Sequence, residues 1–202
     1  MLKPKSHQKL SVADYLEDEK LTETRHELID GEVYAMSGTS ANHARITGNF
    51  AAELRQQLKR TPCEPFTESL KLRVGDNFYY PDVMVSCDES DKDDPYYRQR
   101  PILLVEVLSK STQQYDRTHK AEIYRTIPSL QEYVLIEQDR VDVEVQRRSE
   151  GWVSRHYYLG DEVPLESVGT AIPVTEIYDR VENGDVAEWL AKQAAQAPSE
   201  SV

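Results

Sequence analysis

The run from Ile102 to Leu108 constrains the fold more than any other stretch, because it is almost wholly apolar and yet contains Glu106. A short apolar run of this kind is typical of a central β-strand that is covered on both faces. An ionised carboxylate in such a strand is strongly disfavoured unless it is protonated, paired or bound to a metal. Glu106 is therefore expected either in a buried ion pair or as a metal ligand at the end of a core strand.

The rest of the chain alternates between helical and extended patterns. Hydrophobic periodicity predicts helices over 12–19, 41–58, 113–126 and 174–178. It predicts strands over 25–29, 32–36, 69–74, 80–85, 102–108, 130–137, 141–148 and 152–158. Asp30-Gly31 and Gly75-Asp76-Asn77 indicate turns between strands, and Thr112 is the expected side-chain cap of the helix over 113–126. Mixed strands with two main helices predict an α/β (or α+β) fold, a mixed β-sheet flanked by helices.

Length and cysteine usage bound the organisation. The 202 residues suit a single domain over 1–180, followed by a polar C-terminal tail over 181–202 that is partly helical or disordered. Cys63 and Cys87 form no paired motif, which favours ordinary thiols in a reducing, cytoplasmic location. No secretory signal and no membrane span are expected, because every apolar run is far shorter than the roughly 20 residues that cross a bilayer.

The net charge of −12 argues against a polyanion as partner, because affinity for DNA comes from Lys and Arg. The charge is not uniform, however. Residues 98–125 and 45–73 each hold six Lys or Arg against three acids, whereas the negative excess lies in 14–32, 88–94 and 176–202. A local basic face is therefore compatible with the sequence but is not established by it.

Asp82 and Lys120 join Glu106 as candidates for chemistry. Asp82 follows Pro81 at the start of a strand, where an acid is otherwise often only a turn residue. Asp116, Lys120 and Tyr124 are spaced by four on the helix that follows Glu106, so they lie on one face. Asp116 and Lys120 in this spacing are also an ordinary helix-stabilising pair. The functional interpretation is that this helix folds back and brings the ammonium to the carboxylates.

Two carboxylates and a lysine suit the hydrolysis of a phosphodiester. Mg²⁺ or Mn²⁺ prefers oxygen ligands, here Asp82 and Glu106, and retains water molecules. The metal lowers the pKa of bound water, and a nearby ammonium such as Lys120 orients that water or stabilises the developing charge. The residue types are common ones, so the prediction depends on their combination.

The sequence resembles the PD-(D/E)XK nuclease superfamily through Pro81-Asp82 and Glu106. It is more closely similar to the Uma-type family of putative restriction endonucleases. The stretches that carry this similarity are Glu27–Tyr34, Asn42-His43, Val105–Thr112, Tyr115–Lys120 with Tyr124, and Glu132-Tyr133. The resemblance implies a restriction-endonuclease-like core, Mg²⁺ or Mn²⁺ as cofactor, DNA as substrate and a homodimer. The superfamily's lysine normally lies two residues after the glutamate, where this chain has Leu108, and the resemblance implies that Lys120 takes its role.

Glu32 and His43 are secondary candidates, together with Asp116 and Tyr124, because the family's hairpin and first helix border the cleft. His43 could equally be a capping or surface histidine, and Glu32 a solvated strand residue. The five histidines show no zinc-like spacing, so a zinc site is not expected.

Two functions from different classes remain open. The first is a Mg²⁺- or Mn²⁺-dependent endonuclease that hydrolyses DNA through Asp82, Glu106 and Lys120. The second is a nuclease-like binding or accessory module that retains the fold with weak or absent turnover. The position of the acidic and basic segments relative to Glu106 bears on the choice between them.

Overall fold

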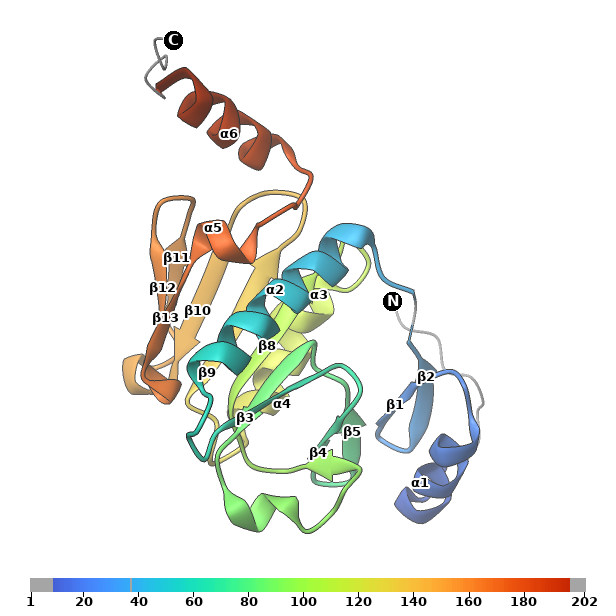
Figure 1. Ribbon diagram of the computed structural model, residues 1–202. Helices are drawn as coiled ribbons and strands as arrows, with labels where there is room; N and C mark the ends of the chain where they lie inside the picture. The colour runs from blue at the N-terminus through green and yellow to red at the C-terminus, as the bar shows by residue number, and fades with distance from the viewer. Residues whose placement is uncertain (1–8, 37, 197–202) are drawn as a thin grey trace.

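The structure is a computed structural model, and it describes residues 9–36 and 38–196. Its centre is a mixed six-stranded sheet (Figure 1). In spatial order the strands are β11 (Ser154–Tyr157), β10 (Val143–Arg147), β9 (Glu132–Glu137), β8 (Pro101–Leu108), β6 (Val83–Ser86) and β3 (Glu64–Thr67). The predicted central strand is β8, which pairs parallel to β9 and antiparallel to β6.

Side chains alternate between the two faces of the sheet along β8, and a helical segment covers each face. Leu103, Val105 and Val107 face α2 (Ala41–Gln57), whose Ile46 and Phe50 are fully buried in the same cluster. Glu106 shares the other face with Leu104 and Leu108, beneath the helical segment that follows β8. The two-fold repeat of a strand therefore aims the Glu106 side chain at that segment.

The helical segment after β8 is interrupted by a wider turn. It consists of α3 (Gln113–Tyr115), a π-turn over Asp116–Lys120 and α4 (Ala121–Arg125). Such π-turns inside α-helices frequently occur at functional sites. The expected side-chain cap by Thr112 is wrong, because its hydroxyl makes no capping bond. Ser109 instead accepts the Thr112 N–H at 3.3 Å, so the preceding loop satisfies that group.

A second sheet lies beside the first. Its five strands, in spatial order, are β2 (Glu32–Ala35), β1 (His26–Ile29), β5 (Asn77–Tyr79), β4 (Lys71–Val74) and β7 (Tyr97–Arg98). Helix α1 (Val12–Leu21), which Ser11 caps, packs on this sheet through Tyr15 and Phe78, whose ring centroids are 5.2 Å apart.

Of the strand predicted over 80–85, only 83–85 forms a strand, as part of β6 (Val83–Ser86). The turn at Gly75 joins β4 to β5, and the chain then crosses at Tyr80–Asp82 before β6 begins. Pro81 has no N–H to donate to a strand partner, which is a physical reason for a break at this point. The crossing places Asp82 between the two sheets.

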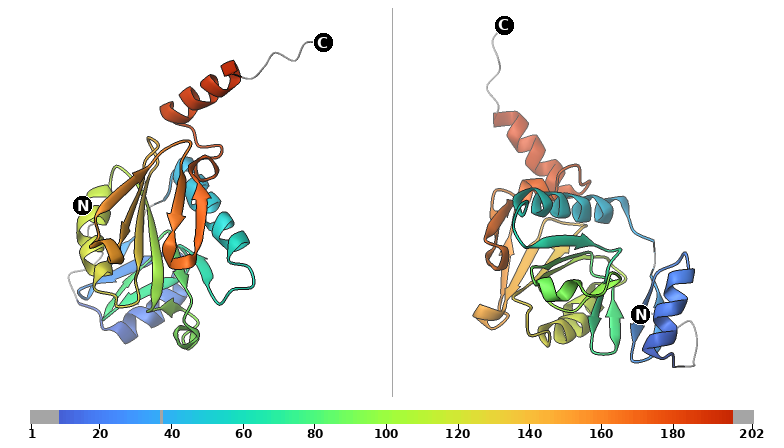
Figure 2. Two further views of the ribbon diagram at one scale, coloured as in Figure 1. Left: turned by 90° about the vertical axis from the view of Figure 1, so that its left-hand side faces the viewer. Right: turned by 60° about the horizontal axis from the view of Figure 1, so that its bottom comes forward.

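The C-terminal part adds a hairpin that the sequence did not reveal, before the helix predicted over 174–178. A hairpin of β12 (Glu162–Leu165) and β13 (Thr170–Pro173) precedes α5 (Val174–Ile177). Helix α6 (Gly184–Gln196) then extends away from the body of the molecule (Figure 2). Short 3-10 turns occupy Glu89–Lys92, Arg148–Glu150 and Glu166–Val168. No helix in the described part of the chain is both long and apolar enough to cross a membrane.

The expectation of free thiols is wrong, because Cys63 and Cys87 form a disulfide. The two cysteines flank the paired residues Glu64 and Ser86, which lie opposite each other on β3 and β6. The register of these strands therefore brings together two cysteines that are 24 residues apart in the sequence. The sequence carries no spacing motif from which this pairing follows.

Candidate active site

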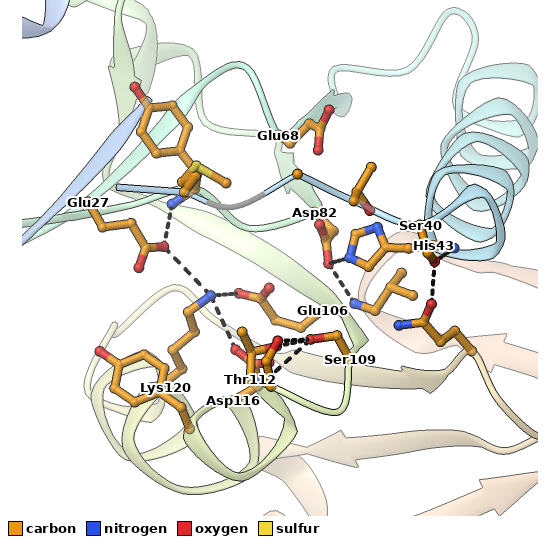
Figure 3. A pocket seen from close by; sticks show the side chains of 18 residues that line it. Glu27, Ser40, His43, Glu68, Asp82, Glu106, Ser109, Thr112, Asp116 and Lys120 are labelled. Carbon is orange, nitrogen blue, oxygen red and sulfur yellow. Dashed lines mark hydrogen bonds and ion pairs between the residues drawn. The ribbon is translucent and has the colours of Figure 1, made fainter. Parts of the chain in front are cut away.

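A pocket of about 300 Å³ lies between the two sheets, at the N-terminal end of α2 and beside the loop that follows β8 (Figure 3). The residues that line it come from both sheets, from α2 and from the helical segment after β8. They are Glu27, Met36, Gly38, Thr39, Ser40, His43, Glu68, Tyr80, Asp82, Glu106, Val107, Ser109, Ser111, Thr112, Tyr115, Asp116, Lys120 and Gln138. The three residues that the sequence singled out, Asp82, Glu106 and Lys120, are among them.

Asp82 is held from two sides. Its Oδ2 accepts the backbone N–H of Val107 at 2.6 Å, and the same oxygen lies 3.2 Å from His43 Nε2. One contact comes from the neighbouring strand and the other from the first turn of α2. The carboxylate is therefore fixed in direction, which suits a ligand that must meet a second carboxylate at a defined place.

Glu106 is 4% exposed and makes two side-chain contacts through the same oxygen. Its Oε1 accepts the Tyr124 hydroxyl at 2.9 Å and lies 3.0 Å from Lys120 Nζ. Burial raises the pKa of Glu106 well above its usual range, and the charges of Asp116, Asp82 and Glu27 raise it further, while Lys120 opposes them. A cation placed beside this carboxylate would favour its ionised form.

Lys120 is surrounded by three carboxylates. Its Nζ lies 3.0 Å from Glu106, 3.3 Å from Asp116 and 3.6 Å from Glu27. Burial alone lowers the pKa of Lys120, but the three acids outweigh it and raise the pKa well above its ordinary value. The buried ammonium is therefore charged, and its position is set by residues from three separate elements.

His43 enters the pocket from the first turn of α2. Ser40 caps this helix by accepting the His43 N–H at 3.1 Å, so the cap fixes the residue that carries the imidazole. Burial lowers the pKa of His43, but the hydrogen bond and the charge of Asp82 raise it by more, so the net direction is upward. His43 is thus a partner of Asp82 and not a surface histidine.

The other secondary candidates divide into two groups. Asp116 lines the pocket and contacts Lys120, and Tyr124 donates to Glu106 from α4. Glu32 does not line the pocket. Its carboxylate accepts the Tyr34 hydroxyl at 2.8 Å on β2. The hairpin does border the site, but Glu27 is the acid that it contributes.

Glu27 was missed as a site residue, although it lies within a stretch that carries the family resemblance. It sits in β1, is 6% exposed, and accepts the Tyr80 N–H at 3.1 Å. The available signal was the same as for Glu106, an acid within a short strand. The run His-Glu-Leu-Ile places two polar residues before two apolar ones, so the sequence does not show that all four residues of this strand are buried.

The donor set fits a hard divalent cation. Five carboxylates line the pocket, together with the basic side chains of Lys120 and His43. These donors are oxygens, and such ligands suit Mg²⁺ or Mn²⁺ better than zinc. No three acids, histidines or cysteines in the described residues converge as a ready cage. The site thus offers two candidate ligands, Asp82 and Glu106, and leaves the remaining positions to water or substrate, as is usual for Mg²⁺.

The pocket is acidic although half of its lining residues come from the two basic segments of the sequence. Lys120 is the single Lys or Arg among its lining residues within the part of the chain that the structure describes. From those segments the pocket takes Glu68, Glu106 and Asp116, and from the acidic stretch 14–32 it takes Glu27. The pocket therefore carries an excess of negative charge, like the whole chain, and this excess favours the binding of a cation.

Comparison with solved structures shows the class of fold. The fold resembles the crystal structure of a putative nuclease belonging to DUF820 from Anabaena variabilis, with a TM-score of 0.71 and 19% identity, over 86% of this chain and 99% of the other. The molecule therefore has a nuclease-like α/β fold.

Residues 12–175 match the family model of Uma2, described as putative restriction endonuclease, and the chain belongs to this family. Two relatives from Synechocystis sp. are the uncharacterized proteins slr1290 and sll1609. The first is 34% identical over 84% of this chain and 92% of its own length. The second is 38% identical over 64% of this chain and 75% of its own length. The resemblance inferred from the motifs is thereby confirmed.

Proposed function

We propose that the protein is a divalent-metal-dependent endonuclease that hydrolyses phosphodiester bonds of DNA. The observation that carries the proposal is the contact of 3.0 Å between Lys120 Nζ and Glu106 Oε1, in a pocket that Asp82 also lines. A buried pair of a lysine and an acid often stabilises a fold no more than a hydrophobic pair of similar size would. A chemical function is therefore a reason for this pair to be present. Membership of the Uma2 family supports the same class of reaction.

Each residue has a role in this proposal. Asp82 and Glu106 hold Mg²⁺ or Mn²⁺, which supplies a more acidic bound water and withdraws charge from the phosphoryl group. Lys120 orients the attacking water and stabilises the charge that develops on phosphate oxygens. His43 keeps Asp82 in place through the contact of 3.2 Å.

DNA as the substrate is part of the proposal, and it needs cations at the rim of the pocket. Lys110 is the clearest candidate, because it lies between the lining residues Ser109 and Ser111 and its side chain is 85% exposed. Its Nζ is 3.6 Å from Asp139, a surface contact that a phosphate can replace. A homodimer and a cytoplasmic location belong to the same proposal. The disulfide between Cys63 and Cys87 means that the cysteines no longer support that location.

A second candidate function is a nuclease-like binding or accessory module with weak or absent turnover. The acidic lining of the pocket and the net charge of −12 favour it, because both repel a phosphate backbone. This candidate predicts that the protein binds a divalent cation without cleaving nucleic acid.

A plasmid-nicking experiment tests the proposal. The wild-type chain is incubated with supercoiled DNA and Mg²⁺ or Mn²⁺, beside Lys120→Met, Asp82→Asn and the control Lys192→Met on the exposed helix α6. We expect the two pocket variants to lose about 10²-fold or more in rate, the usual effect of removing a group that stabilises the transition state, and the control to match the wild type. Equal nicking by all four proteins would overturn the proposal. Cation binding by calorimetry without nicking would support the second candidate.

A further inference from the structure

Glu27 reaches the pocket from a different sheet than the other acids around Lys120. It lies on β1, which pairs antiparallel with both β2 and β5, so its backbone is held on two sides. Its Oε1 accepts the Tyr80 N–H at 3.1 Å and is 3.6 Å from Lys120 Nζ. The carboxylate is therefore anchored to backbone at the crossing between the sheets, and the anchor does not depend on Lys120.

The three carboxylates around Lys120 are not equivalent. Glu106 is the nearest at 3.0 Å, and Asp116 lies one turn away on the same helical segment. Figure 3 shows the ammonium between Glu27 on one side and Glu106 and Asp116 on the other. Asp116 moves with the segment that carries Lys120, so it cannot fix the ammonium relative to the sheets. Glu27 can, because it belongs to another element.

The proposed function changes the contacts of Lys120, because it gives Glu106 a second partner. If Glu106 serves as a metal ligand, its Oε1 is no longer available to Lys120 in the same way. A buried ammonium that loses a partner is strongly penalised unless another anion remains beside it. Without Glu27, the partners left to Lys120 would be Glu106, in competition with the metal, and Asp116, which is carried by the same helical segment as Lys120.

We propose that Glu27 is a positioning residue: it retains the Lys120 ammonium in the pocket when Glu106 serves as a metal ligand. The inference rests on the proposed metal site and deepens it. Glu27 does not act on the substrate. It acts through Lys120, and it lowers the competition between Lys120 and the metal for one carboxylate oxygen.

Glu68 provides a matched control for the loss of a negative charge. It also lines the pocket, but its carboxylate lies 3.7 Å from Arg25 Nη1. Among the described residues, the acids within 4.0 Å of Lys120 Nζ are Glu27, Glu106 and Asp116. Glu27→Gln and Glu68→Gln therefore remove the same charge from the same pocket. Glu27→Gln also keeps an oxygen that can accept the Tyr80 N–H, and Glu27→Asp keeps the charge.

The experiment uses the full chain labelled with ¹⁵N at lysine, titrated with Mg²⁺. The Nζ resonance of Lys120, assigned from Lys120→Met, reports whether the buried ammonium is protected from exchange with water. Calorimetry gives the Mg²⁺ affinity of each protein. We expect the wild type to keep the resonance in saturating Mg²⁺ and Glu27→Gln to lose it. We expect Mg²⁺ affinity to fall about 10-fold in Glu27→Gln, in the range found for residues that support metal ligands.

The controls separate a specific role from general electrostatics. Glu68→Gln is expected to keep the Lys120 resonance and to weaken Mg²⁺ binding less than Glu27→Gln, and Glu27→Asp is expected to restore part of the affinity. The inference is overturned if Glu27→Gln retains the resonance in Mg²⁺, if both Gln variants weaken binding equally, or if the wild type binds no Mg²⁺. If Glu27→Gln behaves as expected but the wild type cuts no DNA, the inference stands and the proposed nuclease function fails. If the wild type cuts DNA and Glu27→Gln matches it in resonance and affinity, the inference fails alone.

Discussion

The Asp82 side chain extends the hydrogen bonding between β6 and β8 at the residue just before β6 begins. Residue Val83, the first of β6, pairs with Val105, and two residues further along β8 the N–H of Val107 donates to Asp82 Oδ2 at 2.6 Å. The strand that carries Glu106 thus donates a backbone hydrogen bond to the carboxylate of Asp82, the other candidate ligand. One contact fixes both the end of the sheet and the direction of a carboxylate.

Asp82→Ala is therefore expected to lower stability as well as activity. The buried Val107 N–H would lose its acceptor, and an unsatisfied buried donor costs about 1–3 kcal/mol. Asp82→Asn keeps an oxygen at this place and should retain most of the free energy of unfolding. Urea denaturation of the two variants checks the difference. Equal losses in both would show that the Val107 bond contributes little.

Glu106→Gln is expected to become more stable relative to the metal-free wild type as the pH rises, although it removes a partner of Lys120. The pKa of Glu106 in the folded protein is raised above its ordinary value of 4.5. The stability contributed by such a group is full below the ordinary pKa and is lost as the pH rises through the folded pKa. The variant has no carboxylate to ionise, so its melting temperature relative to that of the wild type should be higher at pH 8 than at pH 5. Calorimetry in the presence of a chelator measures this, and a difference independent of pH would contradict it.

Glu132→Ala is expected to destabilise the protein without weakening Mg²⁺ binding. Glu132 lies in a stretch that carries the family resemblance, but it is 1% exposed and its Oε1 accepts from Arg147 Nε at 2.8 Å. Its other oxygen accepts the Ser167 N–H, also at 2.8 Å. Removing one partner of a buried ion pair costs roughly 3–5 kcal/mol. Chemical denaturation and calorimetric titration below the unfolding transition test the two halves of the prediction. A loss of Mg²⁺ affinity by the folded variant would assign Glu132 a role in the site.

Reduction of the disulfide is expected to lower stability by about 3 kcal/mol. The bond between Cys63 and Cys87 closes a segment of 24 residues, and a loop of this length gives a stabilisation of that order through the unfolded chain. Thermal unfolding with and without a thiol reductant measures the effect. The double variant Cys63→Ser with Cys87→Ser should resemble the reduced protein and be insensitive to reductant. Should reductant shift its melting temperature as well, the disulfide is not the cause.

The central strand β8 and the pocket positions of Glu106, Lys120 and Asp116 could be predicted because their signals are local. Glu106 interrupts an apolar run, and Lys120 and Asp116 follow at helical spacing. Glu27 and the closeness of the two sheets could not be predicted, because they depend on the crossing at Tyr80–Asp82, which brings together residues far apart in the sequence.

Prolines explain two of the strands that the sequence did not reveal. Strand β3 contains Pro65, and it lies at the edge of its sheet, where a residue without an N–H is tolerated. Strand β12 contains Pro164 in a hairpin of only two strands, where both strands are edges. A proline lowers the expectation of a strand from sequence, although edge positions permit it. The pairing of β3 with β6, and with it the disulfide, was missed for the same reason.

The π-turn over Asp116–Lys120 makes the direction of the ammonium depend on a surplus residue. Each residue of an α-helix turns the chain by about 100°, since 3.6 residues complete a turn. Shortening this segment by one residue would turn the side chains that follow it relative to Asp116, and the contacts of Lys120 and Tyr124 with Glu106 depend on that direction. The contacts in the pocket thus depend on a π-turn that a regular α-helix would lack.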